Sequence, residues 1–94
     1  MTATQEPDIS AGFRTYPNPV RDQLIIDPLQ DWSGAYELQM LDAQGRLWIR
    51  QKIDLNRAQS IDVSGLPDGL YLLHLRHESK GAARWKVVKA GNRE

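Results

Sequence analysis

Tyr36-Glu37-Leu38-Gln39-Met40 alternates apolar with polar side chains, and Asp42-Ala43-Gln44-Gly45 follows it closely. Alternation with a period of two predicts a β-strand with one face buried and the other face in water. Asp at the first position and Gly at the last of the second segment favour a type I turn, a common short link of a hairpin. We therefore expect the chain to reverse direction here.

The return strand, residues 47–54, carries the second half of this hairpin. Its alternation predicts Leu47, Ile49 and Ile53 on the inner face, with Gln51 at the same parity. The opposite parity predicts that Trp48 faces outward, together with Arg50, Lys52 and Asp54.

Similar alternating segments recur between turn signals about ten residues apart, as in a β-sandwich. We count about seven strands, whose expected positions are Phe13 to Tyr16, Gln23 to Asp27, Tyr36 to Met40, 47–54, Ser60 to Val63, Tyr71 to Leu75 and Ala83 to Lys89. The predicted fold class is all-β, an immunoglobulin-like antiparallel β-sandwich.

Two proline-containing segments punctuate these strands. In Tyr16-Pro17-Asn18-Pro19, two prolines remove ladder donors, so this segment should lie at a sheet edge or crossover. Leu66-Pro67-Asp68-Gly69 reads as a type I turn with Pro in its favoured second place. Tyr71 follows this turn as in the tyrosine corner of immunoglobulin-like domains, where the hydroxyl bonds back to nearby backbone.

Length and composition limit the classes of function. A chain of 94 residues with 40% hydrophobic and 26% charged side chains makes one ordinary globular domain. Twelve basic side chains balance twelve acidic ones, so no overall field attracts a nucleic acid or an anionic membrane. Cysteine is absent, which excludes disulfides and zinc-thiolate sites.

The start of the chain has the character of a linker. No apolar run approaches the roughly 20 residues of a membrane span, and residues 1–10 lack a secretory signal. The chain is therefore expected either to stay in the cytoplasm or to be the tail of a longer precursor. We expect residues 1–12 to be a linker to an upstream cargo, residues 13–89 the sandwich, and residues 90–94 a flexible tail.

The sequence offers little support for a catalytic function. His74 and His77 are three residues apart on one strand, so parity sends them to opposite faces and prevents a shared metal ion. No serine lies in a Gly-x-Ser-x-Gly elbow, no phosphate-binding glycine loop is present, and nothing marks a cleft around the carboxylates. We predict that the chain is not an enzyme and that it has no cofactor or metal site.

The tryptophans and the basic residues are the remaining candidates for a binding role. Trp85 is expected at the core or its rim and Trp32 in loop packing, whereas the predicted exposure of Trp48 suggests either a contact role or a lid over the sandwich edge. The last two strands are locally basic, with Arg76, Lys80, Arg84, Lys86, Lys89 and Arg93. The ordinary explanation is that these cations protect an edge strand from unwanted pairing with another strand. The more specific explanation is that they dock an acidic partner.

Four segments in order resemble the pattern of the C-terminal sorting domains of the type IX (Por) secretion system. The first is Tyr16, Pro17, Asn18 and Pro19, and the second is Gly45 with its neighbours; the third has Leu66, Pro67, Gly69 and Tyr71, and the last is Lys86, Val87, Val88 and Lys89. The resemblance covers roughly Phe13 to Lys89. These residues are the candidate recognition motifs that it implies.

The resemblance also implies a function. Such domains end exported cargo proteins, fold in the periplasm and are recognised by an outer-membrane translocon, after which a sortase removes the domain in many members. The implied location is export through the periplasm to the cell surface or medium. Two other readings stay open: a carbohydrate-binding or adhesion module that uses Trp48 and Trp32, and an inert spacer domain.

Overall fold

The computed structural model describes residues 8–29 and 34–90, in which one short 3-10 helix precedes seven strands and no α-helix occurs. The helix, η1, spans Ser10–Gly12, and the strands are β1 (Phe13–Tyr16), β2 (Gln23–Pro28), β3 (Ala35–Asp42), β4 (Leu47–Asp54), β5 (Gln59–Asp62), β6 (Gly69–His77) and β7 (Gly81–Lys89). The predicted number of strands is confirmed.

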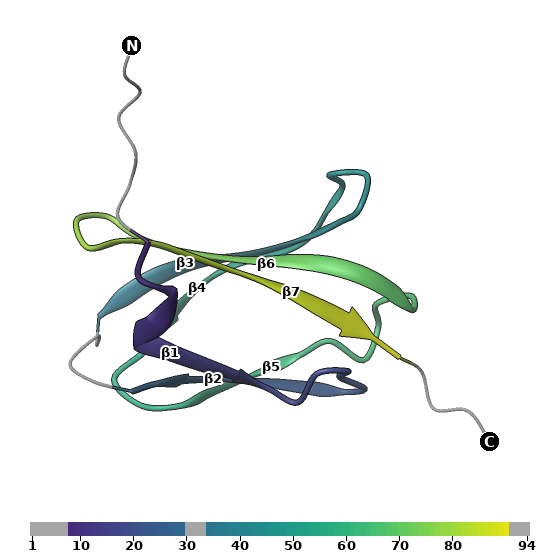
Figure 1. The fold of residues 1–94 in the computed structure, drawn as a ribbon, viewed down its shortest axis with the longest axis horizontal. Helices are drawn as coiled ribbons and strands as arrows, with labels where there is room; N and C mark the ends of the chain where they lie inside the picture. The colour runs from purple at the N-terminus through teal and green to yellow at the C-terminus, as the bar shows by residue number, and fades with distance from the viewer. Residues whose placement is uncertain (1–7, 30–33, 91–94) are drawn as a thin grey trace, which may run out of the picture.

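The strands form two antiparallel sheets that lie face to face (Figure 1). One sheet has the order β1-β2-β5 and the other the order β4-β3-β6-β7. The hairpins β1–β2, β3–β4 and β6–β7 each stay within one sheet, while the other links cross between the sheets. The predicted all-β sandwich is therefore confirmed.

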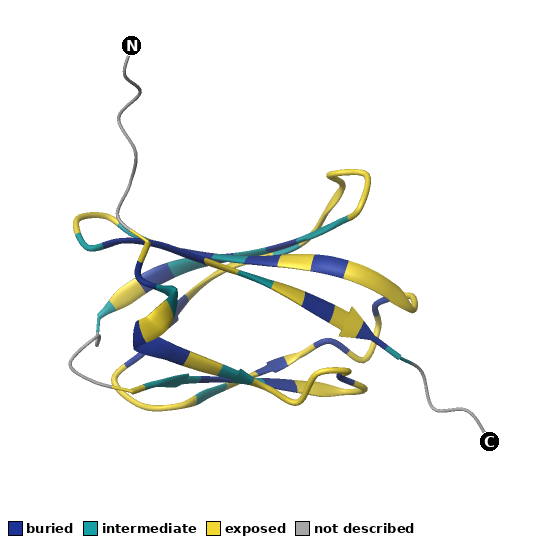
Figure 2. Cartoon of the chain, in the orientation of Figure 1, coloured by how far each residue is buried: buried dark blue, intermediate teal, exposed yellow. Residues whose placement is uncertain are grey.

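The core lies between the two sheets, and the alternating bands of Figure 2 show how each strand contributes to it. Inward-facing residues of the three-stranded sheet are buried, with Leu24 and Ile26 fully enclosed. The facing sheet contributes alternate residues of β3 and β6, which are Tyr36, Leu38, Met40, Tyr71, Leu73 and Leu75. All of these inward positions were predicted from period-two alternation, and each is confirmed.

The segment between β1 and β2 contacts the opposite sheet before the chain returns to its own sheet. Strand β1 lies at the edge of its sheet, and Val20 forms a parallel bridge with Lys89 of the opposite sheet. The Tyr16-Pro17 and Asn18-Pro19 peptide bonds are both cis. The expectation of an edge or crossover at this segment is confirmed.

The β3–β4 hairpin has the predicted turn, and its return strand β4 spans the predicted residues 47–54 but with a shift in register. The Gly45 N–H donates to the Asp42 carbonyl at 2.9 Å, and Gly45 has a φ of +85° that favours glycine. A β-bulge then shifts the register, so that Met40 pairs with Ile49 but Leu41 pairs with Leu47.

The bulge overturns part of the predicted pattern in β4. Leu47 was predicted inward, yet 45% of it is exposed, because the extra residue reverses parity at the start of the strand. Gln51 keeps the inner parity but is exposed at the sheet edge. Ile53 is buried and Ile49 packs against the core, as expected.

The turn before β6 lies earlier than predicted. Its hydrogen bond runs from the Leu66 N–H to the Val63 carbonyl at 3.1 Å, so residues 63–66 form the turn instead of Leu66 to Gly69. The Asp62 carboxylate explains the shift, since it accepts bonds from the Ser64 N–H and hydroxyl and so fixes the chain reversal at that point.

The described chain is packed from its first residues. Ile9 is buried in the core, and its N–H donates to the Ala82 carbonyl at 2.9 Å. Asp8 forms a parallel bridge with Ala82. The N-terminal segment therefore contacts β7 before the first strand begins.

Candidate recognition surface

The first and last of the four motif segments are joined by the side chain of Asn18. Its Nδ2 donates to the Lys86 carbonyl at 3.0 Å, and its Oδ1 accepts from the Val88 N–H at 2.9 Å. Next to it, the Val20 N–H donates to the Val88 carbonyl and the Ala90 N–H to the Val20 carbonyl. The segment thus lies along the free edge of β7 and satisfies its backbone groups.

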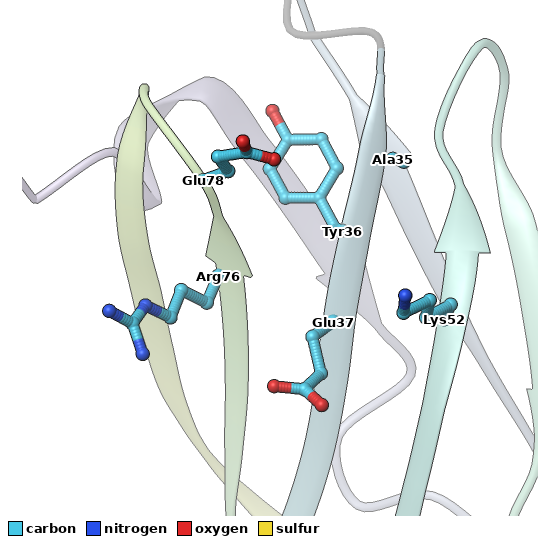
Figure 3. Close-up of a pocket in the computed structure, with 6 residues that line it drawn as sticks. All are labelled: Ala35, Tyr36, Glu37, Lys52, Arg76 and Glu78. Atoms are coloured by element: carbon cyan, nitrogen blue, oxygen red, sulfur yellow. The ribbon is translucent and has the colours of Figure 1, made fainter.

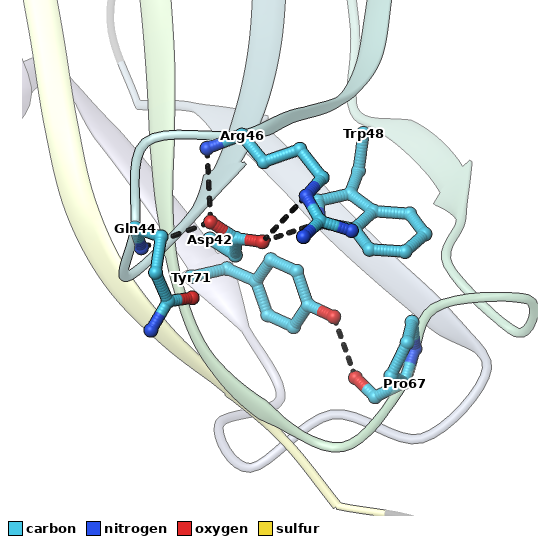
Figure 4. A network of polar contacts seen from close by, with 6 residues as sticks. All are labelled: Asp42, Gln44, Arg46, Trp48, Pro67 and Tyr71. Carbon is cyan, nitrogen blue, oxygen red and sulfur yellow. Dashed lines mark hydrogen bonds and ion pairs between the residues drawn. The ribbon is translucent and has the colours of Figure 1, made fainter.

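Asp42 organises the β3–β4 turn (Figure 4). Its Oδ1 accepts from the backbone N–H groups of Gln44 and Arg46, each at 2.9 Å, while its Oδ2 accepts from the Trp48 indole at 2.9 Å. These bonds, the indole's first, hold the pKa of the Asp42 carboxyl below its usual value. One carboxylate therefore fixes both the turn and the bulged start of β4.

Tyr71 forms the predicted tyrosine corner. Its hydroxyl donates to the Pro67 carbonyl at 2.6 Å, as Figure 4 shows. Burial raises the pKa of this phenol, and the charges of Asp42 and Asp68 raise it further. Tyr71 pairs across the sheet with Asp42, so the second and third motif segments are neighbours.

Strand register brings the four segments to one end of the four-stranded sheet. Gly69 lies opposite Lys89, and Tyr71 lies opposite Val87 on β7. Asn18 and Val20 contact this same end of β7, and Tyr71 also pairs with Asp42 beside the β3–β4 turn. Segments up to about 70 residues apart in the sequence thus meet at one place, which we call the motif end.

The candidate motif residues divide sharply by exposure. The buried ones are Leu66, Tyr71, Val87 and Lys89. The exposed ones are Tyr16, Pro17, Asn18, Pro19, Gly45, Pro67, Gly69, Lys86 and Val88. The buried residues form the fold, so a partner protein has direct access only to the exposed set.

The tryptophans occupy different environments. Trp48 is 37% exposed, as predicted, but its indole N–H is bound to Asp42 and the Arg46 guanidinium lies 5.7 Å from the ring centroid. Trp85 packs edge-on against Phe13 at the rim of the core, which confirms its expected position. Trp32 lies outside the described residues.

The histidines lie on opposite faces of β6, as strand parity predicted. His77 has the inner parity, and its ring contacts that of Tyr36 with centroids 4.9 Å apart. Its Nδ1 accepts from the N–H groups of Ser79 and Lys80. In the part of the chain that the structure describes, no three acidic or histidine side chains gather in a way that suits a metal ion.

A hollow lies away from the motif end, on the outer side of the four-stranded sheet (Figure 3). It has a volume of about 430 Å³, and Glu37 lies in it between Lys52 and Arg76 on the neighbouring strands. A hydrogen bond from Arg50, at 2.9 Å, holds the pKa of the Glu37 carboxyl below its usual value. The charges here compensate one another, and no nucleophile and base are paired.

Sequence reasoning missed two features of this region. The contact between Asn18 and β7 joins residues 68 and 70 positions apart, and no local pattern marks such a contact. The apolar residues that face away from the core were also overlooked. The sequence does carry a signal for these, since Leu70, Leu72 and Val88 stand at the outward parity of their strands.

A family model described as a secretion system C-terminal sorting domain matches residues 14–90. A search of curated proteins finds no match. Across residues 8–29 and 34–90, the structure has no helix with the length and apolar character of a membrane span.

Proposed function

We propose that the export machinery recognises the folded sandwich, because this chain belongs to the family of type IX secretion system C-terminal sorting domains. The chain is a sorting signal of this system, and such a signal directs export toward the cell surface or the extracellular space. The proposal concerns the finer steps, namely which proteins read the signal and what happens to it.

The motif end is the observation that carries the proposal. The four segments of the sequence pattern are joined there by the Asn18 bonds to β7 and by the pairing of Asp42 with Tyr71. Unfolding would separate these segments, since the contacts that join them are tertiary. A receptor that reads them together therefore requires the folded domain.

In this proposal the domain stands behind a cargo protein, reaches the periplasm with it and folds there. An outer-membrane translocon then binds the exposed residues of the motif end. A sortase removes the domain once the cargo has crossed the membrane. The domain itself acts as a sorting signal and as the substrate of the sortase, and it performs no catalysis.

Reporter export tests the proposal. Residues 1–94 are fused behind a fluorescent protein with a periplasmic signal, in a bacterium that has this secretion system and in a mutant without the translocon. We expect surface or medium fluorescence only in the intact strain. Retention of the fusion in the periplasm of the intact strain would contradict the proposal.

A matched pair of variants tests whether the motif end is required. Asn18→Ala removes both bonds to β7, whereas Asn56→Ala changes an exposed asparagine in the loop after β4. We expect the first variant to lower surface delivery and the second to leave it unchanged.

Removal by a sortase is tested by mass spectrometry of the surface-delivered reporter. The expected product lacks the sandwich, and a strain without the sortase keeps the full-length fusion. If the reporter at the surface of the intact strain still carries residues 13–89, the removal step is wrong.

A carbohydrate-binding module is the second candidate, and the exposure of Trp48 is the observation in its favour. The Arg46 guanidinium and the bond to Asp42 already occupy part of this indole, which reduces the ring surface left for a sugar. Titration of a broad glycan panel against tryptophan fluorescence tests this candidate. We expect a flat response.

A further inference from the structure

Five apolar side chains gather on the outer side of the four-stranded sheet, near the motif end. Directly paired residues of an antiparallel sheet project to the same face. Leu41 pairs with Leu47 on β4 and with Leu72 on β6, while Leu70 pairs with Val88 on β7. We call these five residues the outer patch, which crosses all four strands.

The outer patch is open to solvent. Leu47, Leu70, Leu72 and Val88 are between 38% and 47% exposed, and Leu41 between them is half-buried. Single exposed apolar residues are ordinary, whereas a contiguous group on a monomer's surface marks an interaction site. The cost of leaving these side chains in water therefore calls for a partner.

The patch is hollowed as well as apolar. A groove of about 340 Å³ lies along Leu41, Leu70 and Leu72, and the β3–β4 turn at Gly45 closes one side. Its lining is mostly apolar and includes two charged residues, Asp42, which is bound within the β3–β4 turn, and Lys86. A concave surface of this kind suits side chains inserted by another protein, since a flat bilayer surface does not enter it.

The charges around the patch indicate what kind of protein segment fits. Lys86 pairs with Leu72 inside the patch, and Arg84 is the next outward-facing residue on β7. Farther along the same face, Arg50, Lys52 and Arg76 surround Glu37, which is bound by Arg50. On the outward face of the four strands, the cations Arg50, Lys52, Arg76, Arg84 and Lys86 outnumber the carboxylates Glu37 and Asp54. Because the chain as a whole has no net charge, this face is basic relative to the rest, although the charges in the hollow around Glu37 largely balance.

We propose that the outer patch binds a protein segment with apolar side chains flanked by carboxylates, carried by a component of the export machinery. This inference rests on the proposed function and names the surface used for it. Charge complementarity selects an acidic partner over a second copy of this chain, because a face-to-face pair brings Lys86 and Arg84 of both copies together. The apolar side chains supply affinity and the cations supply orientation.

The test uses the full reporter fusion with two exposed-leucine variants. Leu70→Ser with Leu72→Ser removes the centre of the patch, whereas Leu29→Ser changes a leucine that is 49% exposed just after β2 in the other sheet. We expect the double variant to lower surface delivery about tenfold, because interface leucines contribute through buried apolar area. Leu29→Ser is expected to leave delivery unchanged.

A charge change gives a second, independent readout. Lys86→Glu keeps an exposed side chain on β7 but reverses its charge beside the patch, and Arg57→Glu is the matched change at an exposed position in the loop after β4. Delivery is expected to fall only for Lys86→Glu. Thermal unfolding of each purified variant is measured in parallel, so that a loss of delivery in a folded domain is separated from unfolding.

Each other outcome overturns the inference in a recognisable way. If the unchanged fusion is not delivered, the proposed function itself fails. If it is delivered and the folded double variant is delivered equally well, or Leu29→Ser fails as badly, the patch is not the surface used.

Two measurements decide between a protein partner and the other occupants. Flotation with phosphatidylglycerol vesicles that the double variant abolishes would assign the patch to a membrane. A dimer in light scattering that the double variant abolishes would assign it to self-association. We expect neither, with the domain monomeric and absent from both phosphatidylglycerol and phosphatidylcholine vesicles.

Discussion

Strands β7 and β4 form the two edges of the four-stranded sheet, and the chain treats these edges differently. Along β7, the chain before β2 bonds to Ala82 through Ile9, to Arg84 through Ser10, and to Lys86 and Val88 through Asn18 and Val20. Within the described residues, no strand or bridge pairs with the outer edge of β4.

The difference shows two ways of protecting a sheet edge. At β7 the backbone groups are satisfied by another part of the chain, far away in the sequence. At β4 the protection is local, because a bulge near Trp48 interrupts the regular ladder and the charged residues Arg50 and Lys52 point outward. We call β7 the covered edge and β4 the open edge. The contacts along the covered edge contribute to global stability, whereas the bulge and the charges of the open edge mainly limit association with other molecules.

Val20→Ala has the largest expected effect, because it creates a cavity where the covered edge meets the core. Val20 is fully buried and lies between Val88 and Ala90. We expect a loss of about 2 kcal/mol in the free energy of unfolding, measured by urea denaturation. A loss no larger than that of Ala58→Gly, in the exposed loop before β5, would contradict this account of the edge.

Asn18→Ala removes two hydrogen bonds from the covered edge and leaves the core packing intact. We expect a loss of about 1 to 2 kcal/mol in the free energy of unfolding. The Val88 N–H, which donates to Asn18 in the native domain, should lose hydrogen-exchange protection more than amides in the centre of β6. Equal protection of Val88 in both proteins would show that this bond is absent in solution.

Asp42→Asn loosens the open edge through its turn, with a smaller expected effect at neutral pH. The folded-state pKa of Asp42 is lowered, so its stabilising contribution is complete above the unfolded pKa of about 3.9 and is lost as pH falls through the folded pKa. We expect the variant's melting temperature to fall less on acidification below about pH 4 than that of the unchanged protein. Parallel acid profiles would contradict a role for this carboxylate.

Arg50→Thr with Lys52→Thr has the smallest expected effect on stability, within about 0.5 kcal/mol, because both side chains are exposed. Its effect should be on association, since the open edge loses its charges. Light scattering at rising protein concentration measures this. Arg84→Thr on the covered edge, where the Arg84 N–H already donates to Ser10, is the matched change that should leave the protein monomeric.

Local patterns predicted those elements whose environment depends on near neighbours in the sequence. The inward residues of β3 and β6, the β3–β4 turn and the tyrosine corner follow from alternation and turn chemistry. The inward prediction for Leu47 was wrong because one inserted residue reverses the parity of the strand. The predicted position of the turn before β6 was wrong because the Asp62 carboxylate binds the Ser64 N–H and favours an earlier chain reversal.

The candidate site was predicted only as a set of segments. Their order along the chain indicated the family, which the match over residues 14–90 shows. Neither their meeting at one end nor their division into buried and exposed residues followed from the pattern. The expected boundaries at residues 13 and 89 stay predictions, although Ile9 already packs in the core.

Alternation with a period of two and turn residues act over a few positions, so they were enough to predict the strands, the buried face of β3 and β6 and the kind of domain. The contact of Asn18 with β7 and the gathering of five outward leucine and valine side chains in one patch are visible in the folded domain alone. Strand order and register set these contacts, and both depend on which distant segments pair when the two sheets close on the core.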